Sequence, residues 1–219
     1  MVNIGVLVSG SGTNLQSIID AIEAGRCDAS IKVIISNRPD AFALERAKKH
    51  GIAKAVVRVK DFPGREAFDT EILRILRENG VELIVLAGFM RIISRVLLDA
   101  YHMRIMNIHP SLLPSFPGLE VHKAALEYGV KFSGCTVHFV DGGLDSGPII
   151  IQAAVPVKDE DTVESLSKRI LAEEHRIYPE AIQLYSEGRL EVRGRRVFIR
   201  NSQPPVSAVT NPLITIQSP

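Results

Sequence analysis

An asparagine and a histidine at the end of an apolar run have the residue types and spacing for catalysis. Asn107 and His109 are two positions apart, so in extended backbone their side chains project from the same face. The asparagine amide can donate a hydrogen bond to an oxyanion, and an imidazole can also supply a proton. The pair predicts a site that stabilises negative charge on a reacting oxygen. The alternative is a capping asparagine beside a buried structural histidine.

A glycine-rich loop over residues 141–147 carries the carboxylate that would complete such a site. Asp145 is surrounded there by glycines and a serine, which give it little steric shielding or competing charge. A carboxylate beside His109 would favour the protonated imidazole, which then acts as an acid near neutral pH. The alternative is a hairpin turn in which the aspartate bonds its own backbone.

The stretch Ser9-Gly10-Ser11-Gly12-Thr13-Asn14 predicts an anion site between the first apolar run and the first helix. Free amide groups and the helix dipole attract an anion at this position, and glycines let a phosphate approach the backbone. Leu15 occupies the place of the third glycine in a dinucleotide fingerprint, and the P-loop lysine is missing. These features favour a compact monophosphate over a nucleoside triphosphate or a dinucleotide. A plain tight turn is the alternative.

The elements that must position these residues alternate between short apolar runs and helical stretches. The continuous apolar runs predict parallel strands covered by helices on both faces, joined by right-handed crossovers. The fold class is therefore α/β, with a doubly wound, mostly parallel sheet. The predicted strands cover 3–8, 31–35, 54–59, 82–87 and 104–108, and the predicted helices include 41–49 and 67–78.

The pattern changes after residue 130. Strands are predicted over 134–140 and 148–157, and their connection is too short for a crossover helix, so they should pair antiparallel. A long helix over 164–185 and a terminal hairpin follow. We expect one domain over 1–202, divided into a phosphate-binding half (1–103) and a catalytic half (104–202), with a loosely held tail over 203–219.

Composition narrows the function classes. The 219 residues carry a net charge of +1, which disfavours a nucleic-acid partner because such proteins concentrate basic charge. No signal peptide or membrane span is evident, so a cytoplasmic protein with reduced Cys27 and Cys135 is expected. A metal triad of His109, His138 and Asp145 is disfavoured because no ligand spacing supports it. His138 is expected in the core, and His50 and His102 in solvent.

Several motifs together identify a resemblance. They are SGSGTNL at 9–15, LAGFMRI at 86–92, NIHPSLLP at 107–114, DSGP at 145–148 and EEH at 173–175. With them, the sequence over about residues 1–200 resembles the family of phosphoribosylglycinamide formyltransferases, in the folate-dependent formyltransferase superfamily. The resemblance implies transfer of a formyl group from 10-formyltetrahydrofolate to the glycyl amine of phosphoribosylglycinamide, in purine biosynthesis.

The resemblance also implies roles for individual residues. Asn107, His109 and Asp145 would be catalytic. The substrate would contact Gly12, Thr13, Asn14, Leu171, Ala172, Glu173 and Glu174. The folate would contact Arg65, Met90, Arg91, Ile92, Ile93, Asn107, Asp141, Gly142, Gly143, Leu144 and Asp145. Two departures from the family pattern are Ile93, where leucine is familiar, and Gly142-Gly143, which makes the folate loop unusually flexible.

The same resemblance implies small-molecule substrates, no metal, no nucleic acid and no membrane, and a monomer or a homodimer. Three alternatives stay open at this point. A related hydrolase would release formate from the same folate, and a methionyl-tRNA formyltransferase would be expected to add a basic C-terminal domain. A non-catalytic nucleotide-binding module would leave the Asn/His pair without a purpose.

Overall fold

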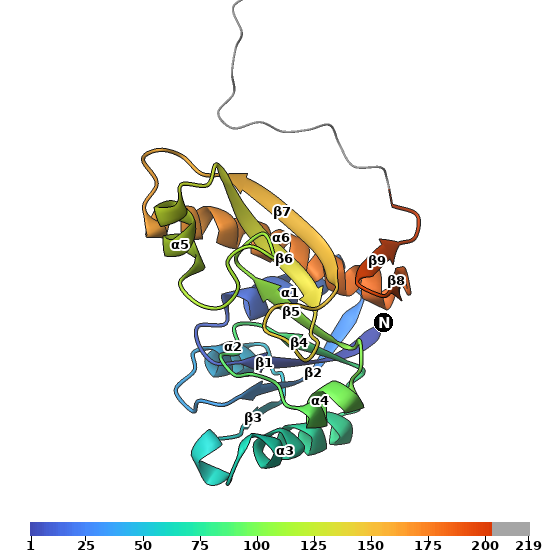
Figure 1. The fold of residues 1–219 in the computed structure, drawn as a ribbon. Helices are drawn as coiled ribbons and strands as arrows, with labels where there is room; N and C mark the ends of the chain where they lie inside the picture. The colour runs from blue at the N-terminus through green and yellow to red at the C-terminus, as the bar shows by residue number, and fades with distance from the viewer. Residues whose placement is uncertain (203–219) are drawn as a thin grey trace, which may run out of the picture.

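The computed structural model describes residues 1–202, and the tail predicted over 203–219 lies outside them. Nine strands of the described chain form one sheet in the order β3-β2-β1-β4-β5-β6-β7-β9-β8 (Figure 1). The strands are β1 Val2–Val8, β2 Ala29–Ser36, β3 Lys54–Val56, β4 Leu83–Leu86, β5 Ile105–His109, β6 Phe132–Phe139, β7 Ile149–Pro156, β8 Leu190–Arg193 and β9 Arg196–Ile199.

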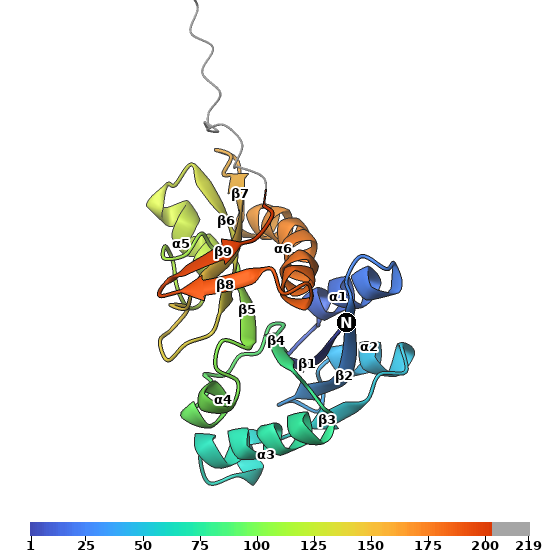
Figure 2. The same ribbon diagram turned by 90° about the vertical axis from the view of Figure 1, so that its right-hand side faces the viewer.

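Helices cover both faces of the parallel strands β1 to β5. The helices of the described chain are α1 Thr13–Glu23, α2 Ala43–Lys49, α3 Arg65–Glu78, α4 Arg95–Ala100, α5 Val121–Tyr128 and α6 Val163–Ser186, with a 3-10 turn at Val59–Asp61. Figures 1 and 2 show α1 and α6 on one side of these strands and α3 with α4 on the other. Alternate residues of β1 enter two separate hydrophobic clusters: Val6 faces α1 and α6, and Leu7 faces α3 and α4.

The strand direction changes between β5 and β6. The pairs β5–β6 and β6–β7 are antiparallel, whereas β3, β2, β1, β4 and β5 run parallel. This confirms the predicted sheet and its antiparallel C-terminal portion. The helix predicted over 164–185 is α6, and the predicted terminal hairpin is β8–β9. The predicted division at residue 103 falls just before β5, and the sheet runs through it without a break.

Three details differ from the sequence predictions. The third strand ends at Val56 rather than at residue 59, and a 3-10 turn occupies Val59–Asp61. The helices α4 and α5 were not expected. The prediction that His50 is solvated was wrong: its ring is 2.7 Å from Glu23 and 3.2 Å from Gln16, and its side chain is only 13% exposed. His102 is exposed, as predicted.

Helix α6 is fixed to the sheet directly behind the catalytic strand. It begins with a capping box between Thr162 and Ser165. Further along, the fully buried Tyr178 places its hydroxyl 2.9 Å from the Leu86 carbonyl and 3.0 Å from the Met106 carbonyl. One hydroxyl hydrogen serves both acceptors, so Tyr178 holds β4 and β5 to the helix. Within residues 1–202, no helix is both long and apolar enough to cross a bilayer.

Tyr178→Phe is expected to lower the free energy of unfolding by about 1–2 kcal/mol, because two buried carbonyls lose their hydroxyl donor. Tyr185→Phe is the matched control on the same helix, since no hydrogen bond from the Tyr185 hydroxyl is present in the described chain. It should change stability by less than about 0.5 kcal/mol. Urea unfolding measures both variants. Equal effects would show that the Tyr178 hydroxyl does not anchor the helix.

Candidate active site

The two predicted catalytic residues of β5 lie at its carboxyl end. Asn107 and His109 occupy alternate positions, so their side chains project from one face of the strand. His109 is buried, with 5% of its surface exposed, and Asn107 is partly buried. Ligands of open α/β sheets bind at this end of the strands. The strand therefore presents an amide and an imidazole where a substrate would approach.

Asp145 lies beside His109, as the sequence analysis required. Its Oδ2 is 3.5 Å from Nδ1 of His109, and the other ring nitrogen, Nε2, is 2.9 Å from the Phe116 carbonyl. The amide of Gly118 donates to the same Oδ2 at 2.9 Å. Both ring nitrogens thus face oxygen acceptors, which suits an imidazole with a proton on each nitrogen. At 3.5 Å the contact is too long for a short hydrogen bond, and it becomes an ion pair when the ring carries both protons.

A second histidine orients Asn107. The antiparallel register places His138 of β6 opposite Asn107, with 3.2 Å between Nδ2 of the amide and Nε2 of the ring. The other ring nitrogen, Nδ1, donates to the Phe139 carbonyl at 2.8 Å. Nε2 is then free to accept from the amide of Asn107. Burial lowers the pKa of His138, which agrees with a neutral ring. The prediction of a satisfied core histidine is confirmed, but its contact with Asn107 was missed.

The loop after β5 is tied to β6 by a buried threonine. The hydroxyl of Thr136 donates to the Ser111 carbonyl at 2.7 Å and accepts the Leu113 amide at 3.1 Å. This loop then supplies the Phe116 carbonyl to His109 and the Gly118 amide to Asp145. Sequence analysis could not identify these backbone groups, because a carbonyl or an amide carries no signal in the residue type.

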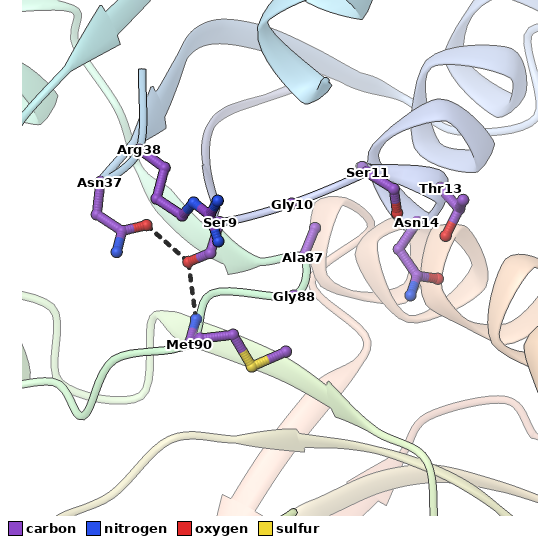
Figure 3. A pocket seen from close by; sticks show the side chains of 11 residues that line it. Ser9, Gly10, Ser11, Thr13, Asn14, Asn37, Arg38, Ala87, Gly88 and Met90 are labelled. Atoms are coloured by element: carbon purple, nitrogen blue, oxygen red, sulfur yellow. Dashed lines mark hydrogen bonds between the residues drawn. The ribbon is translucent and has the colours of Figure 1, made fainter. Parts of the chain in front are cut away.

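The predicted anion loop lines a pocket of about 320 Å³ with residues from three strand ends (Figure 3). The hydroxyl of Ser9 donates to Oδ1 of Asn37 at 2.7 Å and accepts the Met90 amide at 2.9 Å. Helix α1 begins at Thr13, and its first amides have no partner within the helix. The pocket residues are Ser9, Gly10, Ser11, Gly12, Thr13, Asn14, Asn37, Arg38, Ala87, Gly88 and Met90.

One residue of this loop has to be glycine. Gly12 has a φ of +70°, in the left-handed region that side chains rarely adopt, and a Cβ there would lie 2.7 Å from the Cβ of Ala43. The loop therefore turns tightly against α2 just before α1 begins. The turn brings the amides at the start of α1 to the wall of the pocket.

A buried carboxylate of α6 contacts Asn14, which lines this pocket. Glu174 is 6% exposed, and its Oε2 accepts a hydrogen bond from Nδ2 of Asn14 at 2.7 Å. Burial raises the pKa of Glu174. The remaining oxygen of the Asn14 amide is buried and has no partner in the described chain. A hydroxyl or amine donor of a ligand would satisfy this oxygen.

The other residues assigned to substrate along α6 do not share this position. Successive helix residues are about 100° apart around the axis, so the stretch 171–174 cannot face one point. Glu173 forms an ion pair with Arg176 at 2.8 Å, and Ala172 is exposed. Leu171 lies one turn before Glu174 and shares its side of the helix.

The residues assigned to folate form a partly open surface beside the catalytic strand. Met90, Arg91 and Ile92 are exposed, as is Arg65 at the start of α3. Ile93, in contrast, is 8% exposed and packs in the core beneath the loop. Its side chain faces away from the ligand surface, and only its backbone remains available to a ligand.

A buried aspartate fixes the end of the segment 90–93. Oδ2 of Asp69, on α3, accepts the Ser94 amide at 2.6 Å, and burial raises the pKa of Asp69.

The loop over residues 141–147 is held by bonds within itself. Oδ1 of Asp141 accepts the Gly143 amide at 3.0 Å and the Ser146 hydroxyl at 2.6 Å. Gly142 and Leu144 are exposed at the tip of this loop. The loop carrying Asp145 is therefore closed on itself by Asp141.

His109 and His138, which were considered with Asp145 as a metal triad, both lie near the Asp145 carboxylate. His109 is 3.5 Å from one carboxylate oxygen, and Nε2 of His138 is 3.9 Å from the other. Even so, no group of three histidine, cysteine or carboxylate side chains in residues 1–202 has the geometry of a metal site. His109 instead pairs with Asp145, and His138 forms hydrogen bonds with Asn107 and the Phe139 carbonyl.

Comparison with known proteins agrees with this geometry. Residues 2–182 match the Formyl transferase family model. The chain is 42% identical to phosphoribosylglycinamide formyltransferase of Escherichia coli K12, over 93% of this chain and 96% of that protein. It is 51% identical to the trifunctional purine biosynthetic protein adenosine-3 of Drosophila pseudoobscura, over 85% of this chain but only 14% of that protein.

A solved structure shares the whole architecture. Glycinamide ribonucleotide transformylase 1 from Symbiobacterium toebii superposes with a TM-score of 0.90 and 57% identity, over 91% of this chain and 94% of that chain. The match includes the antiparallel strands as well as the parallel ones, because it extends over both halves of the sheet. The chain therefore belongs to the Formyl transferase family.

Proposed function

We propose that this chain transfers the formyl group of 10-formyltetrahydrofolate to the glycyl amine of phosphoribosylglycinamide, giving the formylated ribonucleotide and tetrahydrofolate in purine biosynthesis. The observation that supports this proposal most strongly is the cluster at the end of β5. In it His109 contacts Asp145, and Asn107 contacts His138. Leu86 of β4 pairs with Asn107, so Ala87 and Gly88 bring the anion pocket next to that cluster.

The chemistry follows from the donors. When the substrate amine attacks the formyl carbon, a C–N bond forms and negative charge develops on the formyl oxygen. Asn107 donates a hydrogen bond to that oxygen. The protonated His109 donates a second one, with the Nε2–H that leaves the Phe116 carbonyl when the substrates bind. One such donor contributes about 3 kcal/mol in comparable sites. The C–N bond to the folate then breaks. Asp145 orients the imidazole, and a proton passes from the attacking amine to the departing folate nitrogen through water.

The substrate's two ends suit two parts of the pocket. Gly12, Thr13 and Asn14 line the pocket at the start of α1, where free amides and the helix dipole stabilise a phosphate. Glu174 and the unpartnered oxygen of Asn14 supply acceptors for the ribose hydroxyls. Holding both substrates beside His109 supplies much of the remaining rate enhancement.

The two halves of the sheet have different roles in this reaction. Residues 1–103 supply the phosphate pocket, and residues 104–202 supply the catalytic residues and most of the folate surface, with Arg65 and the segment 90–93 added from the first half. The substrates are small molecules. We place the enzyme in the cytoplasm, acting as a monomer or a homodimer.

Replacing His109 tests the catalytic assignment. His109→Ala should lower kcat at least about a hundredfold, because the transition state loses an oxyanion donor, while folate binding stays measurable. His102→Ala, at an exposed position, is the control and should keep wild-type turnover. The assay follows tetrahydrofolate release by absorbance with and without phosphoribosylglycinamide. Turnover within threefold of wild type would remove His109 from its role, and release without the amine would indicate a hydrolase.

Glu174→Gln should separate stability from substrate binding. Burial raises the pKa of Glu174 in the folded protein. As pH rises, the carboxyl therefore loses its proton in the unfolded chain before it does so in the folded protein, and the wild type becomes less stable. The variant should therefore be more stable than wild type at pH 8, with the gap closing below about pH 4.3. Its KM for phosphoribosylglycinamide should rise about tenfold, through the lost charged acceptor.

Thermal unfolding across this pH range and steady-state kinetics measure the two effects. Glu180→Gln is the matched control, since Glu180 is exposed on the same helix. Its stability difference from wild type should not follow this pH dependence. A Glu174→Gln variant with an unchanged KM would exclude Glu174 from the substrate site.

A further inference from the structure

Arg46 contacts the loop of the anion pocket from behind. Its Nε donates to the Ser11 carbonyl at 2.9 Å, and its Cδ lies 3.5 Å from the place where a Cβ on Gly12 would be. The guanidinium is not among the groups that line the pocket. Its bond goes to the backbone of the loop rather than toward the space that a ligand would fill.

Two successive peptide groups of the loop are held in the same way. The Ala43 amide donates to the Gly10 carbonyl at 3.1 Å, and Arg46 donates to the Ser11 carbonyl. In a planar trans peptide the N–H points opposite to the C=O. With both carbonyls turned toward α2, the amides of Ser11 and Gly12 point to the other side of the loop. Both residues line the pocket on that side.

The guanidinium itself is held in place by neighbours. Its Nη1 donates to Oε1 of Gln16 at 2.9 Å, and its carbon lies 5.1 Å from the centre of the Phe42 ring. Gln16 is in turn oriented by Asp20 at 2.8 Å and by His50 at 3.2 Å. A side chain fixed on two sides loses little entropy when the loop binds a ligand. The guanidinium of Arg46 is thus held in this position before an anion binds.

We propose that Arg46 is a positioning residue for the substrate phosphate. It holds the 11–12 peptide so that the Gly12 amide faces the phosphate, and it does not touch the phosphate itself. A lysine could keep the charge but could not bond Ser11 and Gln16 together in the planar geometry of a guanidinium. This inference rests on the proposed function, because it assumes a phosphorylated substrate in this pocket.

Arg46→Met tests the inference with two substrates. With phosphoribosylglycinamide, KM should rise about tenfold while kcat stays within threefold, because the loop loses a charge-assisted bond remote from the reacting atoms. With the dephosphorylated nucleoside, kcat/KM should equal that of wild type. Arg46→Lys should give an intermediate KM. Lys48→Met removes the same charge from an exposed position of α2 and should leave both substrates unaffected.

Calorimetry with ribose 5-phosphate separates this inference from the proposed function. Wild type should bind ribose 5-phosphate about tenfold more tightly than Arg46→Met. If both bind equally, or if the variant loses kcat/KM equally with the nucleoside, Arg46 does not position the phosphate. If Lys48→Met raises KM as much as Arg46→Met does, the effect comes from the lost positive charge at a distance, and the inference is wrong. If wild type itself binds no ribose 5-phosphate, the proposed phosphate site and this inference fail together.

Discussion

The contact between the Asp145 carboxylate and the His109 imidazole is the interaction on which the rest of the site depends. It joins the end of β5 to the loop between β6 and β7 across 3.5 Å, and both side chains are largely buried. A buried imidazolium is costly unless a counter-charge stabilises it. Asp145 supplies that charge, and the Phe116 carbonyl accepts at the other ring nitrogen. Without the carboxylate, the site would hold a histidine poorly suited to donate to an oxyanion.

The change of strand direction at β5 decides which side chains lie opposite Asn107 and His109. A parallel neighbour would need a crossover and would place its own carboxyl end beside β5. Because β6 runs antiparallel, it places His138 opposite Asn107 and Thr136 opposite His109. β6 ends beside Met106, and the short loop after it folds back so that Asp145 reaches His109. The parallel half, meanwhile, brings the anion loop after β1 to the same edge of the sheet.

Much of the fold could be predicted from local patterns. Continuous apolar runs indicated parallel strands, and the short connection over 141–147 indicated an antiparallel pair. The helices α4 and α5, six and eight residues long, were missed. Length alone does not explain this, because α2 has only seven residues and was predicted. His50 was placed in solvent because its contacts with Glu23 and Gln16 come from a different helix.

The catalytic residues could be named from their types and motifs, but their supporting contacts could not. The pairing of His138 with Asn107 depends on the register between β5 and β6, which sequence spacing does not contain. The Phe116 carbonyl and the Gly118 amide are backbone groups, which the residue type does not reveal. Arg46 reaches the Ser11 carbonyl 35 residues away, through the packing of α2 on the loop.

A double-mutant cycle of His109→Ala and Asp145→Ala, read in kcat/KM, tests the central interaction most directly. If the carboxylate acts through the imidazole, removing it from an enzyme that already lacks the imidazole should cost little, and the double variant should be within about threefold of His109→Ala. If the two losses instead multiply, Asp145 acts on the reaction independently of His109, and the account of this site is wrong.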